Sequence, residues 1–326
     1  MSAFTYGEAA RLAFSGFGLV RREPLTVLAW GVFSAAAMAL LIGLCALIVA
    51  PALTGFTDLA RDSAAPPNPA RMMGMVFGLL GGYFALLGGA LVISAVQGAA
   101  VFRAVLEPGT GGPAHLRFGL QEVWLMAVAV SAIILLSMAM TPFSMVMSLV
   151  MVMSGALPTT APPGPDATPA QLLSTAFPMT AGFWISELLI MTLTLLLMSR
   201  FVLCFPMTFA ERRFRLFEAW GMTRGYTLKM ALMLFVQGVS QYIAMIAFIL
   251  LLGLVAAATV LTRLPEGGMA AMAGKPLSDW IALTWPVIAV AGIAAVPFFG
   301  VFAALYYAPL AEVYRRFRPP AADAFT

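Results

Sequence analysis

Long apolar stretches alternate with short charged segments along the whole chain. Three stretches without any charge cover residues 24–57, 72–102 and 123–165, and each exceeds the roughly 20 residues that a helix needs to cross a bilayer. The pattern predicts an all-α, polytopic six-helix transmembrane bundle with spans at 25–53, 72–102, 123–153, 181–205, 226–261 and 280–311. We expect residues 1–319 to form one integral membrane domain and residues 320–326 to be a disordered tail.

Short amphipathic segments precede the spans. Thr5 and Glu8 have the spacing of a capping box, which predicts a helix that begins near Tyr6. Phe214, Phe217 and Trp220 recur every three residues, which predicts a second amphipathic helix that follows Glu211 and ends at Gly225. With residues 115–122, these segments predict three interfacial amphipathic helices on the cytoplasmic side.

The layout also contains a weak threefold helix-pair repeat. Each even-numbered span ends in an aromatic residue followed by a glutamate, at Glu107, Glu211 and Glu312, which are 104 and 101 residues apart. The repeating unit would be an amphipathic helix, a span, an outer loop and a second span. Repeats of span pairs are common in membrane proteins.

Small and polar residues within the spans indicate how the helices pack. Gly74, Gly78 and Gly82 are spaced by four, as are Gly81, Ala85 and Gly89, and small residues at this spacing allow two helix backbones to approach closely. The span glutamines Gln97, Gln237 and Gln241 could bridge helices by hydrogen bonds.

Composition and charge fix the class and the orientation. Hydrophobic residues make up 62% and charged residues 10%, against about 45–50% and 25% in soluble domains. Fourteen of the 18 Lys and Arg residues fall on one side of the six predicted spans, and the other four are Arg61, Arg71, Arg263 and Lys275. The positive-inside rule therefore predicts that both termini are cytoplasmic.

The densest charged segment lies between residues 199 and 230. Glu211 and Arg215 are four residues apart and predicted to pair. We define the basic rim as the five residues expected to contact lipid or a partner: Arg212, Arg213, Arg215, Trp220 and Arg224. It is interpreted either as an anchor that touches anionic lipid headgroups or as a docking site for a protein partner.

Five polar residues are candidates for intramembrane roles: Glu187, Arg200, Glu211, Gln237 and Gln241. If the fourth span covers 181–200, Arg200 lies at its edge, and Pro206 favours this register by disfavouring an unbroken helix. If the span covers 188–209, Arg200 lies inside the membrane and needs a partner. Glu187 is either a residue near the outer interface or a contact for an ion or substrate.

Few residues suit catalysis or metal binding. The chain has one histidine, His115, and two cysteines without metal-type spacing, and it contains no nucleophile elbow, phosphate loop or paired carboxylates. Met147 and Met151 lie one turn apart, but 22 methionines spread over the spans are typical of apolar filling rather than a copper site. We expect no metal, no cofactor, no nucleic-acid partner and no enzymatic activity.

The segment around residue 211 resembles the membrane domain of bacterial glycerophosphoryl diester phosphodiesterases and related six-span proteins. The resemblance rests on nine residues: Arg200, Pro206, Glu211, Glu218, Ala219, Trp220, Thr223, Arg224 and Gly225. Those enzymes carry their catalysis in a separate soluble domain that this sequence lacks, so the resemblance implies a membrane module and no activity.

Two function classes follow from these observations. The first is a non-enzymatic protein of the bacterial inner membrane, a scaffold or accessory module that contacts lipid or a partner through the basic rim. The second is a transporter or channel for a small solute or lipid, with a path near Glu187 and Arg200. An enzyme acting on lipid ranks third.

Overall fold

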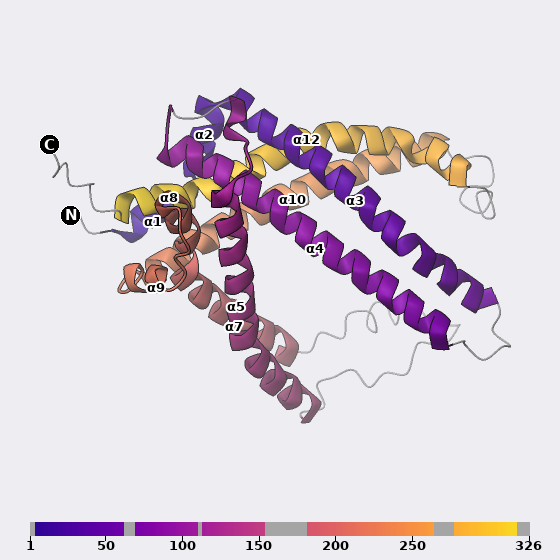
Figure 1. Ribbon diagram of the computed structural model, residues 1–326, viewed down its shortest axis with the longest axis horizontal. Coiled ribbons are helices and arrows are strands. Elements are labelled where there is room, and N and C mark those ends of the chain that lie inside the picture. Colours follow the sequence, from indigo (N-terminus) through magenta and orange to yellow (C-terminus); the bar gives the residue numbers. More distant parts are fainter. Residues whose placement is uncertain (1–3, 62–68, 110–112, 154–180, 264–276, 318–326) are drawn as a thin grey trace.

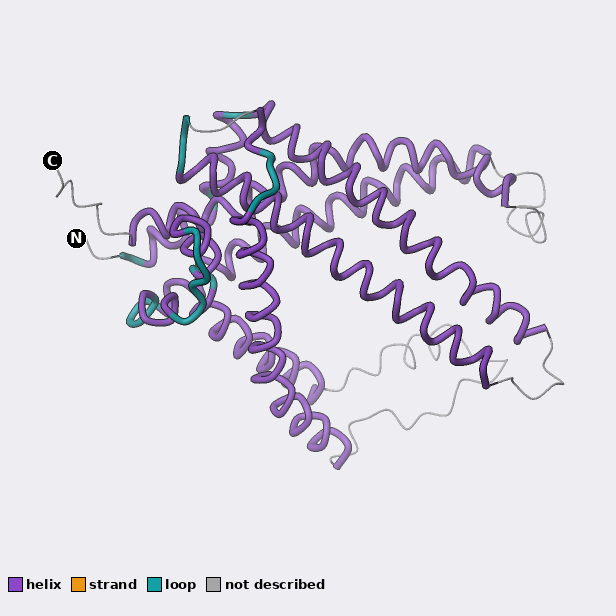
Figure 2. Tube along the Cα trace, in the orientation of Figure 1, coloured by secondary structure: helices purple, strands orange, loops and turns teal. Residues whose placement is uncertain are grey.

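In a computed structural model of the chain, residues 4–61, 69–109, 113–153, 181–263 and 277–317 are described, and their regular structure is helical throughout (Figure 2). The long helices are α3 (Pro24–Arg61), α4 (Pro69–Leu106), α5 (Leu120–Met153), α7 (Ala181–Phe201), α10 (Thr227–Arg263) and α12 (Leu277–Phe317). Among the described residues, six helical segments are long and apolar enough to cross a membrane, the fourth being α7 continued by α8 (Cys204–Glu211). The prediction of an all-α six-helix membrane bundle is confirmed.

Short helices lie between and before the spans: α1 (Tyr6–Ala13), α2 (Ser15–Arg22), the 3₁₀ turn η1 (Pro113–His115), and α9 (Glu218–Met222). The predicted capping box is present. The Thr5 hydroxyl accepts a hydrogen bond from the Glu8 backbone N–H at 3.3 Å, and the Glu8 carboxylate accepts one from the Thr5 N–H at 3.0 Å. Helix α1 therefore begins where the sequence predicts.

Consecutive spans pack in pairs. Helix α3 contacts α4, α5 contacts α7, and α10 contacts α12. Figure 1 shows these pairs diverging from the end of the molecule that carries both termini. Helix α3 also contacts α12, and α7 contacts α10, so the pairs are joined to one another, and the threefold repeat stays a prediction.

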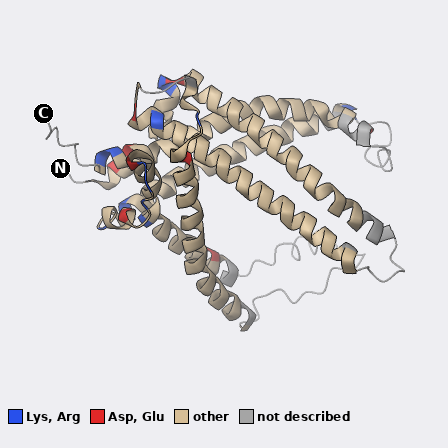
Figure 3. Cartoon of the chain, in the orientation of Figure 1, with Lys and Arg blue, Asp and Glu red and all other residues tan. Residues whose placement is uncertain are grey.

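Charge and the buried core gather at the same end. Most of the Lys, Arg, Asp and Glu positions coloured in Figure 3 lie near the two termini, at what we call the charged end. The buried apolar cluster lies there as well, and every span contributes to it, for example Trp30 from α3, Phe102 from α4 and Tyr314 from α12. Further along the spans, large side chains such as Leu47 and Met145 are exposed, as expected for helices surrounded by lipid tails.

Glycines allow α4 to approach α3 closely. A Cβ atom built on Gly82 would lie 2.3 Å from Val49, and one on Gly89 would lie 2.3 Å from Leu41. Gly78 also faces α3, whereas Gly74 has no neighbour within 4 Å. A Cβ atom on Gly81 would also contact α3, at 3.5 Å from Ile48, so the predicted packing face is confirmed for four glycines and wrong for Gly74.

A second close crossing joins α3 to α12. A Cβ on Gly31 would lie 1.8 Å from the Val296 carbonyl oxygen, and one on Gly300 would lie 2.1 Å from the Val27 carbonyl oxygen. The atoms that block the space are backbone, which cannot rotate away. Because each glycine lacks a Cβ atom, the backbone of the other helix can approach into direct contact.

Two of the three glutamines bridge helices as predicted. Gln97 Nε2 on α4 donates to the Phe299 carbonyl at 3.3 Å, and Gln237 Nε2 on α10 donates to the Tyr306 carbonyl at 2.6 Å. Both acceptors lie on α12. Gln241 Nε2 is buried without a hydrogen-bond partner among the described residues.

We predict that Gly31→Ala or Gly300→Ala destabilises the bundle by about 1–3 kcal/mol, because the added methyl group forces the two backbones apart. Unfolding in mixed micelles measures this. Gly43→Ala on α3 and Gly292→Ala on α12 are matched controls, since neither glycine has a neighbour within 4 Å of a built Cβ. Equal stability of all four variants would contradict the close crossing.

Candidate functional site

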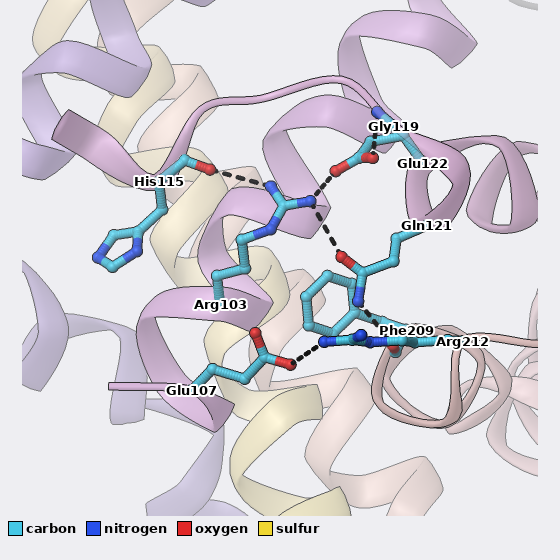
Figure 4. Close-up of polar contacts among 8 residues, drawn as sticks. All are labelled: Arg103, Glu107, His115, Gly119, Gln121, Glu122, Phe209 and Arg212. Carbon is cyan, nitrogen blue, oxygen red and sulfur yellow. Dashed lines mark hydrogen bonds and ion pairs between the residues drawn. The ribbon is translucent and has the colours of Figure 1, made fainter. Parts of the chain in front are cut away.

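A buried arginine lies at the centre of the charged end. Arg103, in the last turn of α4, is 1% exposed. Its guanidinium forms an ion pair with Glu122, donates to the His115 carbonyl at 2.9 Å, and donates to Gln121 Oε1 at 3.4 Å (Figure 4). The pair is buried on both sides, since Glu122 is 0% exposed.

Glu122 also caps α5. This glutamate is the third residue of the helix, and its second carboxylate oxygen accepts from the Gly119 backbone N–H at 2.7 Å. A glutamate at this position that reaches back to the residue before the helix is one half of a capping box. Its negative charge also lies at the positive end of the helix dipole. The Glu122 side chain thus caps the start of α5 and also holds α5 against α4.

The turn before α5 has a strained backbone. Ala114 and His115 are consecutive non-glycine residues in the left-handed region, with φ of 57° and 55°. Such residues cost about 1–2 kcal/mol each and persist where surrounding contacts hold them. Here the Ala114 carbonyl accepts from the indole N–H of the fully buried Trp30 at 2.7 Å, and Arg103 binds the next carbonyl.

Helix α8 completes the cluster. The Arg103 guanidinium carbon lies 5.5 Å from the centre of the Phe209 ring, which is a cation–π distance. Gln121 Nε2 donates to the Phe209 carbonyl at 3.4 Å. We call Arg103, His115, Gln121, Glu122 and Phe209 the arginine node, because Arg103 contacts each of the others and so links α4, η1, α5 and α8.

Helix spacing alone would favour a different partner for Arg103. Glu107, one turn later on α4, could have paired with it. Instead Glu107 lies 4.0 Å from Arg212, whose side chain is 70% exposed. A buried guanidinium needs a partner within the low-dielectric interior, and Glu122 supplies that partner from α5.

The basic rim does not form the predicted single helix. Helix α8 ends at Glu211, Arg212 adopts a left-handed conformation with φ of 56°, and α9 covers only Glu218–Met222. The Arg215 backbone N–H donates to the Thr208 hydroxyl at 3.1 Å, which holds the intervening segment in a non-helical path. The helix predicted from Glu211 to Gly225 is therefore wrong, although Gly225 does have the expected positive φ of 84°.

Ion pairs organise the rim within that segment. The predicted pair of Arg215 with Glu211 is present at 2.9 Å, and Arg215 also contacts Glu218 at 2.5 Å. The hydrogen bond from Arg215 lowers the pKa of the Glu218 carboxyl below its usual value. Arg213 reaches Glu211 at 3.3 Å, but its side chain remains 64% exposed. Arg215 is thus paired with two acids, whereas the charge of Arg213 remains largely exposed.

Arg200 packs against the rim rather than within the spans. Helix α7 ends one residue after it, at Phe201, but the fourth candidate span continues through α8 to Glu211, so neither predicted register is matched in full. Its guanidinium carbon lies 5.1 Å from the Trp220 ring centre, and its carbonyl accepts from the Thr223 hydroxyl at 3.2 Å. One guanidinium nitrogen is buried without a hydrogen-bond partner among the described residues.

The other polar candidates do not meet. Glu187 is exposed on α7, 13 residues before Arg200, which is about 20 Å along the helix axis. Gln237 is 2% exposed and bonded to α12. The structure thus brings Arg200 to Trp220 and Gln237 to Tyr306, and it leaves Glu187 apart from both.

The N-terminal segment is held at the same end. Lys229 Nζ donates to the Phe4 carbonyl at 2.6 Å, and Arg316 pairs with Glu8 at 2.8 Å. The Thr5 backbone N–H and, next, the Arg316 charge lower the pKa of the Glu8 carboxyl. These contacts tie α1 to α10 and α12.

A polar pocket of about 420 Å³ opens beside the arginine node. Arg103 and Glu122 line it and neutralise each other. Arg117 and Arg212 also line it, both are exposed, and neither makes a close ion pair among the described residues. The pocket therefore carries an excess of positive charge, which suits an anionic group.

The sequence interpretation missed the arginine node, although a signal was present. Arg103 directly follows one charge-free stretch, and Glu122 directly precedes the next. Charges that end one span and begin the next lie at one depth in the bilayer and can pair. The spacing of Gly119 and Glu122 is also that of a helix start.

Comparisons of the chain with protein-family models, with curated proteins and with solved structures found no match. The resemblance to the membrane domain of phosphodiesterases therefore remains a prediction.

We predict that Glu122→Gln lowers the unfolding free energy by about 3–5 kcal/mol, because Arg103 is then left buried without a counter-charge. Unfolding in mixed micelles measures the loss. Glu107→Gln is the matched control and should cost at most about 1 kcal/mol, since its partner is exposed and distant.

The double variant Arg103→Met with Glu122→Met should recover most of that loss, because replacing both charges removes the unpaired one. If Glu122→Gln and Glu107→Gln had equal effects, the node would not hold the charged end together.

Proposed function

We propose that this protein is a non-enzymatic module of a bacterial inner membrane that binds anionic lipid headgroups through its basic rim, with the charged end and both termini in the cytoplasm. Headgroups bound in this way would hold the charged end, and any partner attached to it, at the membrane surface. The proposal rests on one observation, the combination of exposed arginines and exposed aromatic rings at the charged end.

The rim has the chemistry of a membrane interface. The side chains of Arg212 and Arg213 are 70% and 64% exposed. Phe217 and Trp220 are 65% and 43% exposed in the same short segment. Aromatic rings favour the headgroup level of a bilayer, and arginines beside them attract anionic lipid.

The interior supports a packed module rather than a solute path. The polar atoms Gln97 Nε2 and Gln237 Nε2 bind carbonyls of α12, and Arg103 is paired. Neither Glu187 nor Arg200 lines the polar pocket at the node. A transporter with a path near Glu187 and Arg200 is the alternative, and the buried nitrogens of Arg200 and Gln241 without partners are the observation that favours it.

We predict that Arg213→Gln with Arg224→Gln weakens the preference of the purified protein for phosphatidylglycerol over phosphatidylcholine roughly tenfold or more, because each surface arginine contributes about 1 kcal/mol. Competition between nanodiscs of phosphatidylglycerol and phosphatidylcholine measures the preference. The double variant Arg213→Lys with Arg224→Lys keeps both charges and should retain it. Equal lipid preference in all three proteins would contradict the proposal.

A cysteine experiment separates the two functions. On a background that lacks Cys45 and Cys204, Gln237→Cys should resist a small water-soluble thiol reagent from both sides, and Arg200→Cys should resist it from the outer side. Arg215→Cys is the control and should react only from the cytoplasmic side. Reaction of Glu187→Cys, Arg200→Cys and Gln237→Cys from the outer side would establish a hydrated path and favour the transporter.

A further inference from the structure

An apolar cavity of about 490 Å³ lies between α4, α5, α8 and α12, next to the arginine node. On α4 its lining extends from Leu87 to Phe102, which is about 22 Å along the helix axis. That length exceeds half of the roughly 30 Å hydrocarbon core of a bilayer. The cavity therefore matches the depth of one lipid leaflet.

Two polar groups in the cavity wall already have hydrogen-bond partners. The Tyr307 hydroxyl donates to the Ser94 carbonyl at 3.1 Å, and Gln97 Nε2 donates to the Phe299 carbonyl. An occupant need not form hydrogen bonds with these groups. The wall thus favours an apolar chain over a polar solute or water.

The cavity is placed where lipid can reach it. Residues 72–102 of the chain carry no charge, so the α4 lining lies on the hydrocarbon side of Arg103. Ile133 and Leu87 line the cavity and are 59% and 48% exposed. Their exposure places the mouth of the cavity on the surface that faces the lipid tails.

Residues adjacent in the sequence line the polar pocket and this cavity on both α4 and α5, although no residue lines both. Phe102 lines the cavity and Arg103 lines the pocket, and on α5 Leu125 lines the cavity and Trp124 the pocket. The pocket's excess charge comes from Arg117 and Arg212. Arginine is well suited to phosphate, because its planar fork of donors matches two phosphate oxygens.

We infer that the two hollows form one binding site for a single anionic phospholipid. One acyl chain occupies the apolar cavity, and the headgroup phosphate contacts Arg117 and Arg212. This site deepens the proposed function and rests on it, since the basic rim first gathers anionic lipid from the same leaflet. It differs from the rim in being saturable at one lipid per protein.

Native mass spectrometry of the full chain tests the site, with phosphatidylglycerol or phosphatidylcholine added to the detergent-solubilised protein. We expect one phosphatidylglycerol retained per protein at activation energies that remove all others. Ala132→Phe, which fills the cavity without changing charge, should abolish this retention. Ala139→Phe is the matched control, because Ala139 is exposed on the same helix and does not line the cavity.

The headgroup is tested separately. The double variant Arg117→Gln with Arg212→Gln should lower the affinity for the retained lipid about tenfold or more, given the strength of charge-assisted hydrogen bonds. Arg22→Gln, at the exposed end of α2 and outside both the pocket and the basic rim, should leave it unchanged. A phosphatidylglycerol with a photoreactive group in its acyl chain should cross-link the unaltered protein within residues 87–102 and 125–136, which does not depend on how the variants fold.

The outcomes separate the site from the proposed function. If phosphatidylglycerol binding is graded rather than saturable at one lipid, and Ala132→Phe does not change it, the single-lipid site is overturned and the rim proposal stands. Retention of phosphatidylcholine as tightly as phosphatidylglycerol would overturn the headgroup assignment. Absence of any anionic preference, in vesicles and in the spectrometer, would overturn both.

Discussion

The buried ion pair between Arg103 and Glu122 is the constraint on which the charged end depends. A guanidinium and a carboxylate removed from water are tolerated only when each finds the other and their remaining donors and acceptors are used. The pair meets most of this demand with groups from several elements, including the His115 carbonyl and the Gly119 N–H, and only Arg103 Nε is buried without a hydrogen-bond partner among the described residues of the pair. Its geometry therefore fixes the end of the second span relative to the start of the third.

Other contacts at this end extend the same constraint. The Trp30 indole holds the strained turn that presents the His115 carbonyl, and thereby ties α3 to the node. Lys229 and Arg316 tie the N-terminal helix to α10 and α12. The polar contacts gather at one end, while the far halves of the spans rely on apolar packing. Since lipid tails are as apolar as leucine, that packing depends on close approach, as at Gly78 and Gly82.

The sequence predicted the features that follow from local rules. Charge-free length located the six spans, and the spacing of Thr5 and Glu8 located the start of α1. It did not predict which acid would pair with Arg103, because helix spacing favours Glu107 whereas burial favours Glu122, 19 residues away. It also placed one helix across Arg212, where a tertiary bond between Thr208 and the Arg215 N–H stabilises a left-handed break that residue preferences do not indicate.

The polar pocket and the apolar cavity differ because polar contacts hold the charged end together, whereas apolar packing holds the spans beyond it. Beside the node, fixed charges define a pocket whose shape the ion pair maintains, so it can discriminate among headgroups. Between α4, α5 and α12 no such charge acts, and helices in a bilayer gain little from closing an apolar gap that lipid tails can fill instead. An empty cavity there would forfeit dispersion contacts on every wall, whereas a chain from the surrounding leaflet restores them. The cavity can therefore persist in a stable bundle because the bilayer itself supplies what completes its packing.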